Sequence, residues 1–93
     1  MDRRGLRGRA VTDLTLITKP DCHLCDVARE VIDVTIAGLP AERADEIEVT
    51  ELSILEDKAL YDTWWEKIPV VLIDGQFHGA WRFTQDRLAS ALS

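Results

Sequence analysis

Cysteine and histidine are scarce in this chain of 93 residues, which contains two of each. A structural zinc site needs four ligands, commonly supplied by two paired cysteine motifs. Cys22 and Cys25 form one such pair, and His23 lies between them at a spacing that suits a shared tetrahedral site poorly. The sequence therefore disfavours a zinc site within one chain, and we predict no metal-ligating residues. An iron–sulfur cluster bridged between two chains and completed by an external thiol is an alternative.

Long apolar runs are also lacking, because no segment approaches the roughly 20 consecutive apolar residues of a membrane-spanning helix. The charged N-terminus lacks the apolar segment that follows it in a secretory signal. We therefore expect a cytoplasmic protein that does not contact membranes. In that reducing compartment, two cysteines indicate catalysis or metal binding more often than a permanent structural disulfide.

Positive charge is limited, since 11 lysines and arginines face 17 acidic residues and the formal net charge is −6. An acidic surface repels nucleic acid, so we expect no nucleic-acid partner.

Four arginines fall within the first nine residues, which indicates a flexible tail over 1–10 before one domain over 11–93. A docking function for this tail is the alternative. No segment indicates an obligate apolar interface, and we expect a monomer.

Short runs of apolar and β-branched residues predict four strands. They are expected over 12–18, 46–50, 68–73 and 77–83. Pro69 stands at the start of the third strand, where a missing N–H group is tolerated. Asp74 and Gly75 predict a hairpin turn between the third and fourth strands.

Helical spacing of apolar residues predicts three helices, over 22–38, 53–64 and 84–92. Ser53 and Glu56 form a capping-box pattern that opens the second helix, and Thr84 is suited to cap the third. The apolar positions at this spacing are Leu24, Val27, Ala28, Val31 and Ile32 on the first helix, Leu55, Ala59, Leu60 and Trp64 on the second, and Leu88, Ala91 and Leu92 on the third.

The resulting order β-α-β-α-β-β-α belongs to the α/β class. The first strand–helix–strand unit predicts two parallel strands joined by a right-handed crossover. The final hairpin predicts an antiparallel pair. We therefore predict a four-stranded mixed sheet with helices on both faces.

Cys22 and Cys25 form a C-x-x-C pair at the junction between the first strand and the first helix. The unpaired N–H groups and the positive end of a helix stabilise a thiolate, which is the reactive form of cysteine. Cys22 is therefore the predicted nucleophile, and Cys25 is predicted to resolve the mixed disulfide formed at Cys22. The imidazole of His23 can also stabilise the thiolate. A purely structural role for both cysteines is the alternative.

The segment Thr18–Cys25, together with Ile68-Pro69-Val70 before the Asp-Gly hairpin, resembles the small glutaredoxin-like family of thioredoxin-fold proteins. The resemblance spans about residues 11–92. It implies a thioredoxin fold with strand order 2-1-3-4, counted along the chain, and dithiol–disulfide oxidoreductase activity. It also implies that no cofactor is bound, that glutathione or another low-molecular-weight thiol donates electrons, and that the substrate is a disulfide-containing protein or a small-thiol disulfide.

Further site residues follow from this resemblance. Pro69 would be cis and would lie against the dithiol, which leaves the backbone of Ile68 free to pair with an extended thiol substrate. Lys19 matches a lysine that favours the thiolate and can meet a carboxylate of glutathione. Trp65, shortly before Ile68, is the candidate for contact with apolar substrate surface, whereas Trp64 is predicted to join the core.

One departure from the family pattern concerns small-thiol binding. Glutaredoxins that bind glutathione usually carry a Gly-Gly turn before the last helix, whereas this chain has Gly79-Ala80-Trp81 there. A standard glutathione site is therefore in doubt, and Trp81 and His78 are predicted to be sheet-surface residues without chemistry. A non-catalytic binding module on the same fold is a further alternative, and the reductase system is unknown.

Overall fold

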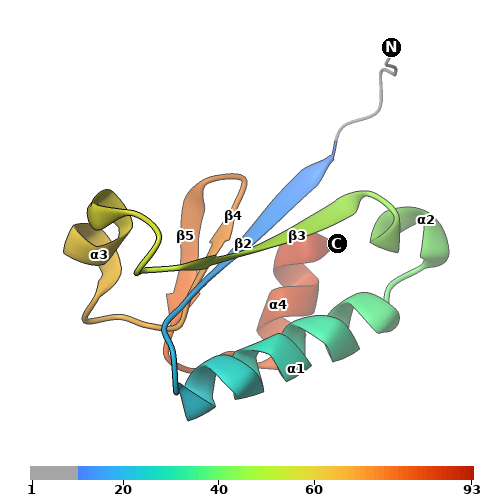
Figure 1. The fold of residues 1–93 in the computed structure, drawn as a ribbon. Helices are drawn as coiled ribbons and strands as arrows, with labels where there is room; N and C mark the ends of the chain where they lie inside the picture. The colour runs from blue at the N-terminus through green and yellow to red at the C-terminus, as the bar shows by residue number, and fades with distance from the viewer. Residues whose placement is uncertain (1–10) are drawn as a thin grey trace.

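The computed structural model describes residues 11–93, so the predicted Arg-rich tail over 1–10 lies outside the described residues. Figure 1 shows the order of the elements along the chain. They are β2 (Thr12–Thr18), α1 (His23–Ala37), α2 (Ala41–Ala44), β3 (Ile47–Ser53), α3 (Lys58–Trp64), β4 (Val70–Ile73), β5 (Gln76–Ala80) and α4 (Gln85–Leu92).

The four strands form one sheet in the order β3-β2-β4-β5. β2 and β3 run parallel over their whole length, from the pair Thr12 and Ile47 to the pair Thr18 and Ser53. β4 lies antiparallel to β2, and β5 lies antiparallel to β4. The predicted α/β class, the mixed sheet and the strand order are therefore confirmed.

The side chains of β2 alternate between two apolar clusters because successive residues of a strand point to opposite faces. Leu14 and Leu16 pack with residues of α1 and α4, which lie side by side in Figure 1. Ile17 points the other way, into a second cluster that includes Leu60 and Trp64 of α3. Helices therefore cover both faces, as the sequence predicts.

The predicted Thr84 cap, the predicted end of the first helix and the hairpin turn are present. The Thr84 hydroxyl oxygen accepts a hydrogen bond from the Arg87 N–H at 3.2 Å and starts α4. Gly38 ends α1 at the predicted position. Asp74 and Gly75 have φ angles of 51° and 80°, the left-handed pair that a tight hairpin turn requires.

The start of α3 differs from the prediction. The Ser53 N–H donates to the Glu56 carboxylate at 2.7 Å, but this contact closes a turn after β3 and opens no helix. Asp57 caps α3 instead, because its carboxylate accepts the Ala59 N–H at 2.7 Å. The capping-box pattern therefore marks a turn over 53–56, which ends directly before the N-cap residue Asp57.

Several residues expected to face the core are exposed. Val27, Leu55, Ala59 and Ala91 face solvent. α4 is eight residues long and buries Leu88 and Leu92, which lie four residues apart on one face.

Two elements also differ from the prediction. β5 ends earlier than predicted, at Ala80, because the next residue, Trp81, has a left-handed φ of 65° and turns the chain out of the strand. The short helix α2 was not predicted, since its four residues are too few for an apolar period.

Within residues 11–93, the helices are all too short or too polar to cross a membrane.

Replacing Leu88 by alanine should lower the free energy of unfolding by about 3 kcal/mol. Leu88 is 0% exposed, and it packs with Leu14 of β2 and Ile32 of α1. Urea unfolding followed by circular dichroism measures the change. Leu55→Ala is the matched control, because Leu55 is 67% exposed and should cost about 0.5 kcal/mol or less. Equal losses in the two variants would contradict the assignment of Leu88 to the core.

Candidate dithiol site

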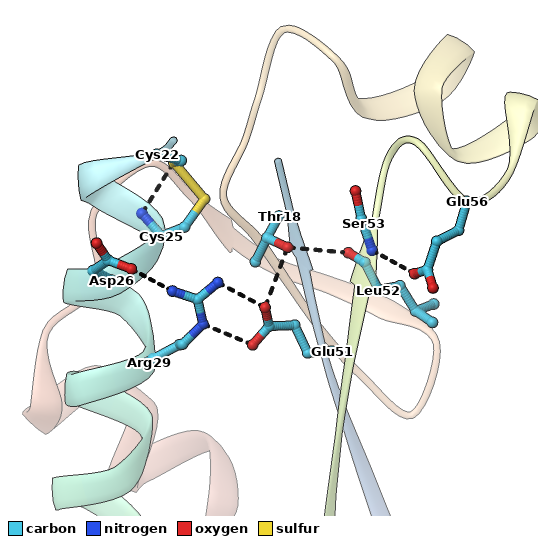
Figure 2. Close-up of polar contacts among 9 residues, drawn as sticks. All are labelled: Thr18, Cys22, Cys25, Asp26, Arg29, Glu51, Leu52, Ser53 and Glu56. Atoms are coloured by element: carbon cyan, nitrogen blue, oxygen red, sulfur yellow. Dashed lines mark hydrogen bonds and ion pairs between the residues drawn. A yellow bond between two sulfur atoms is a disulfide. The ribbon is translucent and has the colours of Figure 1, made fainter. Parts of the chain in front are cut away.

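The two cysteines lie at the start of α1, directly beyond the carboxyl end of β2, and are joined by a disulfide (Figure 2). Cys22 is the N-cap residue of α1. Its Sγ atom accepts a hydrogen bond from the Cys25 N–H at 3.1 Å, and its carbonyl oxygen accepts one from the Asp26 N–H at 3.3 Å. The sulfur thus occupies the position where a helix N-terminus stabilises negative charge.

The two cysteines differ in exposure. Cys25 is fully buried, whereas Cys22 is half-buried and borders solvent. Both pack in the second apolar cluster, which draws on five elements of the fold. Its other members are Ile17, Ile54, Ile68 and Val70, with Leu60, Trp64, Leu72 and Ala80 packed against them. The two cysteines therefore pack against apolar side chains, and Cys25 is enclosed whereas Cys22 is accessible.

The segment before β4 lies against the dithiol. The peptide bond between Ile68 and Pro69 is cis, and both residues are buried. The Ile68 side chain belongs to the same cluster as Cys25. Within residues 11–93, the N–H and C=O groups of Ile68 make no backbone hydrogen bond, and the residue precedes the first ladder position of β4. The structure therefore brings Cys22, Cys25 and Ile68 together, and Pro69 is the next residue after Ile68.

The remaining predicted site residues lie at the surface. Lys19 is exposed in the turn between β2 and Cys22, and His23 is the exposed first residue of α1. Trp65 is 51% exposed, and its ring stacks on Tyr61 at a centroid distance of 6.4 Å. Trp65 is not part of the cluster around the cysteines, whereas Trp64 packs against it. The functional roles of Lys19, His23 and Trp65 remain predictions.

An ion network below the dithiol was not foreseen from the sequence. Arg29 of α1 donates from Nε and Nη2 to the Glu51 carboxylate of β3, at 2.8 and 2.7 Å, and from Nη1 to Asp26 (Figure 2). The Thr18 hydroxyl donates to Glu51 at 3.4 Å. The hydrogen bond to Arg29 holds the pKa of Glu51 below its usual value, against the opposing effect of burial. The network ties the second turn of α1 to the ends of β2 and β3.

Two sequence signals bear on this network. Asp26 and Arg29 are three residues apart, which is the ordinary spacing of a helix ion pair. Glu51 is 22 residues from Arg29, and only the parallel pairing of β2 with β3 brings it there. Arg29 also engages the carboxylate beside Cys25, which reduces the negative charge that Asp26 presents to the dithiol.

Trp81 is a second residue that was not foreseen. The sequence predicts a surface position in a strand, but the Trp81 backbone is left-handed and its N–H donates to the Pro69 carbonyl at 2.8 Å. Its indole Nε1–H donates to the Glu66 carbonyl at 3.2 Å. One feature of the sequence could have indicated this turn. Trp81 directly follows Gly79-Ala80, where the resembling family has a glycine-rich turn.

A C-x-x-C pair at a helix N-terminus, a cis-proline directly before β4 and a sheet of order β3-β2-β4-β5 together define a protein of the thioredoxin-like class. The chain belongs to the family described as Glutaredoxin-like domain (DUF836), which matches residues 13–93. The resemblance stated from the sequence is therefore confirmed.

Solved structures agree with this assignment. The X-ray structure of the structural genomics target protein XcR50 from X. campestris is 28% identical, with a TM-score of 0.65, and the match covers 85% of this chain and 93% of that one. A mutant of the thioredoxin-like protein BC3987 is 18% identical, with a TM-score of 0.56 and coverage of 86% and 99%. Trxlp from Edwardsiella tarda is 12% identical, with a TM-score of 0.62 and coverage of 90% and 84%. The last two show the fold alone.

Replacing Glu51 by glutamine should lower stability at neutral pH by about 0.5 kcal/mol, since the pair with Arg29 is partly exposed. A carboxyl whose pKa is lowered in the folded state stabilises the protein above its unfolded pKa, about 4.3, and this contribution is lost as the pH falls through the folded value. The difference between wild type and variant should therefore shrink below about pH 4.

Urea midpoints measured at a series of pH values test this expectation. Glu48→Gln is the matched control, because Glu48 is an exposed residue of the same strand. A difference for Glu51→Gln that stays constant down to about pH 3 would show that Arg29 does not favour the ionised carboxylate.

Proposed function

We propose that this protein is a dithiol–disulfide oxidoreductase, in which Cys22 is the nucleophile and Cys25 is the resolving thiol. The observation that carries the proposal is the contrast between the two sulfurs. Cys22 borders solvent and accepts an N–H hydrogen bond at the start of α1, whereas Cys25 is fully buried and bonded to it. An incoming disulfide therefore meets Cys22 first, at the position that best supports a thiolate.

The reaction takes two exchange steps. The Cys22 thiolate attacks one sulfur of the substrate disulfide, forms a mixed disulfide, and releases the other substrate sulfur as a thiolate that takes up a proton. Cys25 then loses its proton and attacks the Cys22 sulfur, which releases the second substrate thiol. Two electrons pass to the substrate, and the enzyme is left with the Cys22–Cys25 disulfide described above.

The surrounding residues are assigned supporting roles in this proposal. The unpaired backbone groups of Ile68, held beside the dithiol by Pro69, bind the substrate chain in extended form. Lys19 and His23 add positive or hydrogen-bonding groups near Cys22, and Trp65 offers apolar surface. The substrate is a disulfide-containing protein or a small-thiol disulfide, and a low-molecular-weight thiol, glutathione or another, restores the dithiol in the cytoplasm. The protein acts as a monomer without a bound cofactor.

Replacing Cys22 by serine should abolish disulfide reduction, because no other accessible thiol remains at the start of α1. Wild type and variant are reduced with dithiothreitol, desalted and mixed with a small aromatic disulfide, and release of its thiolate is followed by absorbance. This single-turnover assay does not depend on the physiological electron donor. Release by Cys22→Ser at the wild-type rate would remove Cys22 as the nucleophile, whereas no release by the wild type would favour a non-catalytic binding module.

Replacing Cys25 by serine should leave the first exchange step intact and block the second. The variant should therefore accumulate a stable mixed disulfide at Cys22 when it meets a disulfide substrate. Intact-mass spectrometry under non-reducing conditions measures the adduct. Cys22→Ser serves as the control, because its remaining thiol at Cys25 is fully buried and should form no adduct. Absence of an adduct in Cys25→Ser would contradict the two-step scheme.

A further inference from the structure

Trp81 adopts a backbone conformation that bulky residues rarely take. Its φ is 65°, in the left-handed region where a side chain larger than that of glycine is strained. The strand β5 ends one residue earlier, at Ala80. Such a conformation persists only where surrounding contacts impose it, and it occurs preferentially beside functional sites.

Two hydrogen bonds impose it here. The Trp81 N–H donates to the Pro69 carbonyl at 2.8 Å, and the indole Nε1–H donates to the Glu66 carbonyl at 3.2 Å. Trp81 is thus hydrogen-bonded to both ends of the segment 66–69. Trp81 nevertheless remains 53% exposed, so part of the residue is available to another molecule.

The segment that Trp81 spans lies beside the dithiol. Ile68 belongs to the cluster of Cys25, and Ala80, next to Trp81, packs against that same cluster. The Ile68 backbone groups lack hydrogen-bond partners within residues 11–93. Trp81 therefore lies beside unpaired backbone groups that are suited to pair with an extended chain.

The groups exposed beside the dithiol bear on two classes of substrate. Small molecules bind in concave sites that enclose most of their surface, whereas an extended polypeptide binds an open backbone edge through main-chain hydrogen bonds. The surface at the dithiol combines the unpaired backbone groups of Ile68 with the exposed residue Trp81.

We propose that Trp81 is a specificity-determining residue, which positions the segment before Pro69 and offers its indole to an apolar side chain next to the substrate cysteine. The site thereby prefers cysteines in extended polypeptides over small-thiol disulfides. This inference rests on the proposed function and adds the class of substrate. A tryptophan ring is suited to the contact because it presents a large, rigid apolar face.

The test compares two disulfides that share one leaving group. One is a ten-residue peptide whose single cysteine, flanked by leucines, is bonded to thionitrobenzoate, and the other is the thionitrobenzoate disulfide of mercaptoethanol. In each, Cys22 attacks the substrate sulfur and thionitrobenzoate leaves as the coloured thiolate. Reduced, desalted protein is mixed with each substrate, and the second-order rate constant is measured.

Trp81→Gly should lower the rate constant with the peptide about tenfold, the loss typical of removing an aromatic contact of this kind, and leave the mercaptoethanol rate within about twofold. Trp81→Phe keeps a ring but loses the bond to Glu66, and should lower the peptide rate about threefold. Phe77→Leu is the control, because Phe77 is an equally exposed aromatic of β5, 54% exposed, that stacks on Trp64 instead. It should change neither rate.

The outcomes separate this inference from the proposed function. If wild type releases thionitrobenzoate from neither substrate, or Cys22→Ser matches it, the proposed function fails. If wild type reacts and the Trp81 variants slow both substrates equally, or neither, Trp81 does not select substrates although the oxidoreductase assignment stands. Circular dichroism establishes that each variant is folded, and Trp81→Phe decides the matter if Trp81→Gly does not fold.

Discussion

The Cys25 N–H at the start of α1 donates to the Cys22 sulfur, and the rest of the structure holds this helix end in place. β2 delivers the chain to that point from the centre of the sheet, between β3 and β4. One turn below, Arg29 ties α1 to Glu51 of β3. The cysteine pair therefore has a fixed position relative to three strands, which is what an exchange reaction between aligned sulfurs requires.

Apolar packing also holds the cysteine pair in position. Residues that alternate along β2 divide between the two clusters, so one strand organises the cores on both faces of the sheet. Cys25 joins the cluster that α3 covers, together with Ile68 and Val70. The dithiol is thus continuous with the hydrophobic core, and its environment depends on packing between elements that are far apart in the sequence.

Much of this architecture follows from local patterns. The strand and helix order, the hairpin at Asp74 and Gly75, and the Thr84 cap each depend on neighbouring residues, and each was predictable. The pairing of Arg29 with Glu51 depends on strand register, which the sequence does not display. Trp81 escaped prediction for a different reason, because alternation suggested one more strand residue where backbone contacts to Glu66 and Pro69 impose a left-handed turn. The Ser53 and Glu56 pattern was real but closed a turn instead of opening a helix.

The unequal burial of the two cysteines determines which sulfur of the disulfide an incoming thiol attacks. A thiol that approaches from solvent reaches the Cys22 side of the bond, so the sulfur that departs first is the enclosed one at Cys25. That thiolate is released into the protein interior and remains next to the sulfur it has just left. Whenever the bond opens, the Cys25 thiolate therefore stays buried beside Cys22. From there it can attack the Cys22 sulfur again and release the thiol that has bound to it.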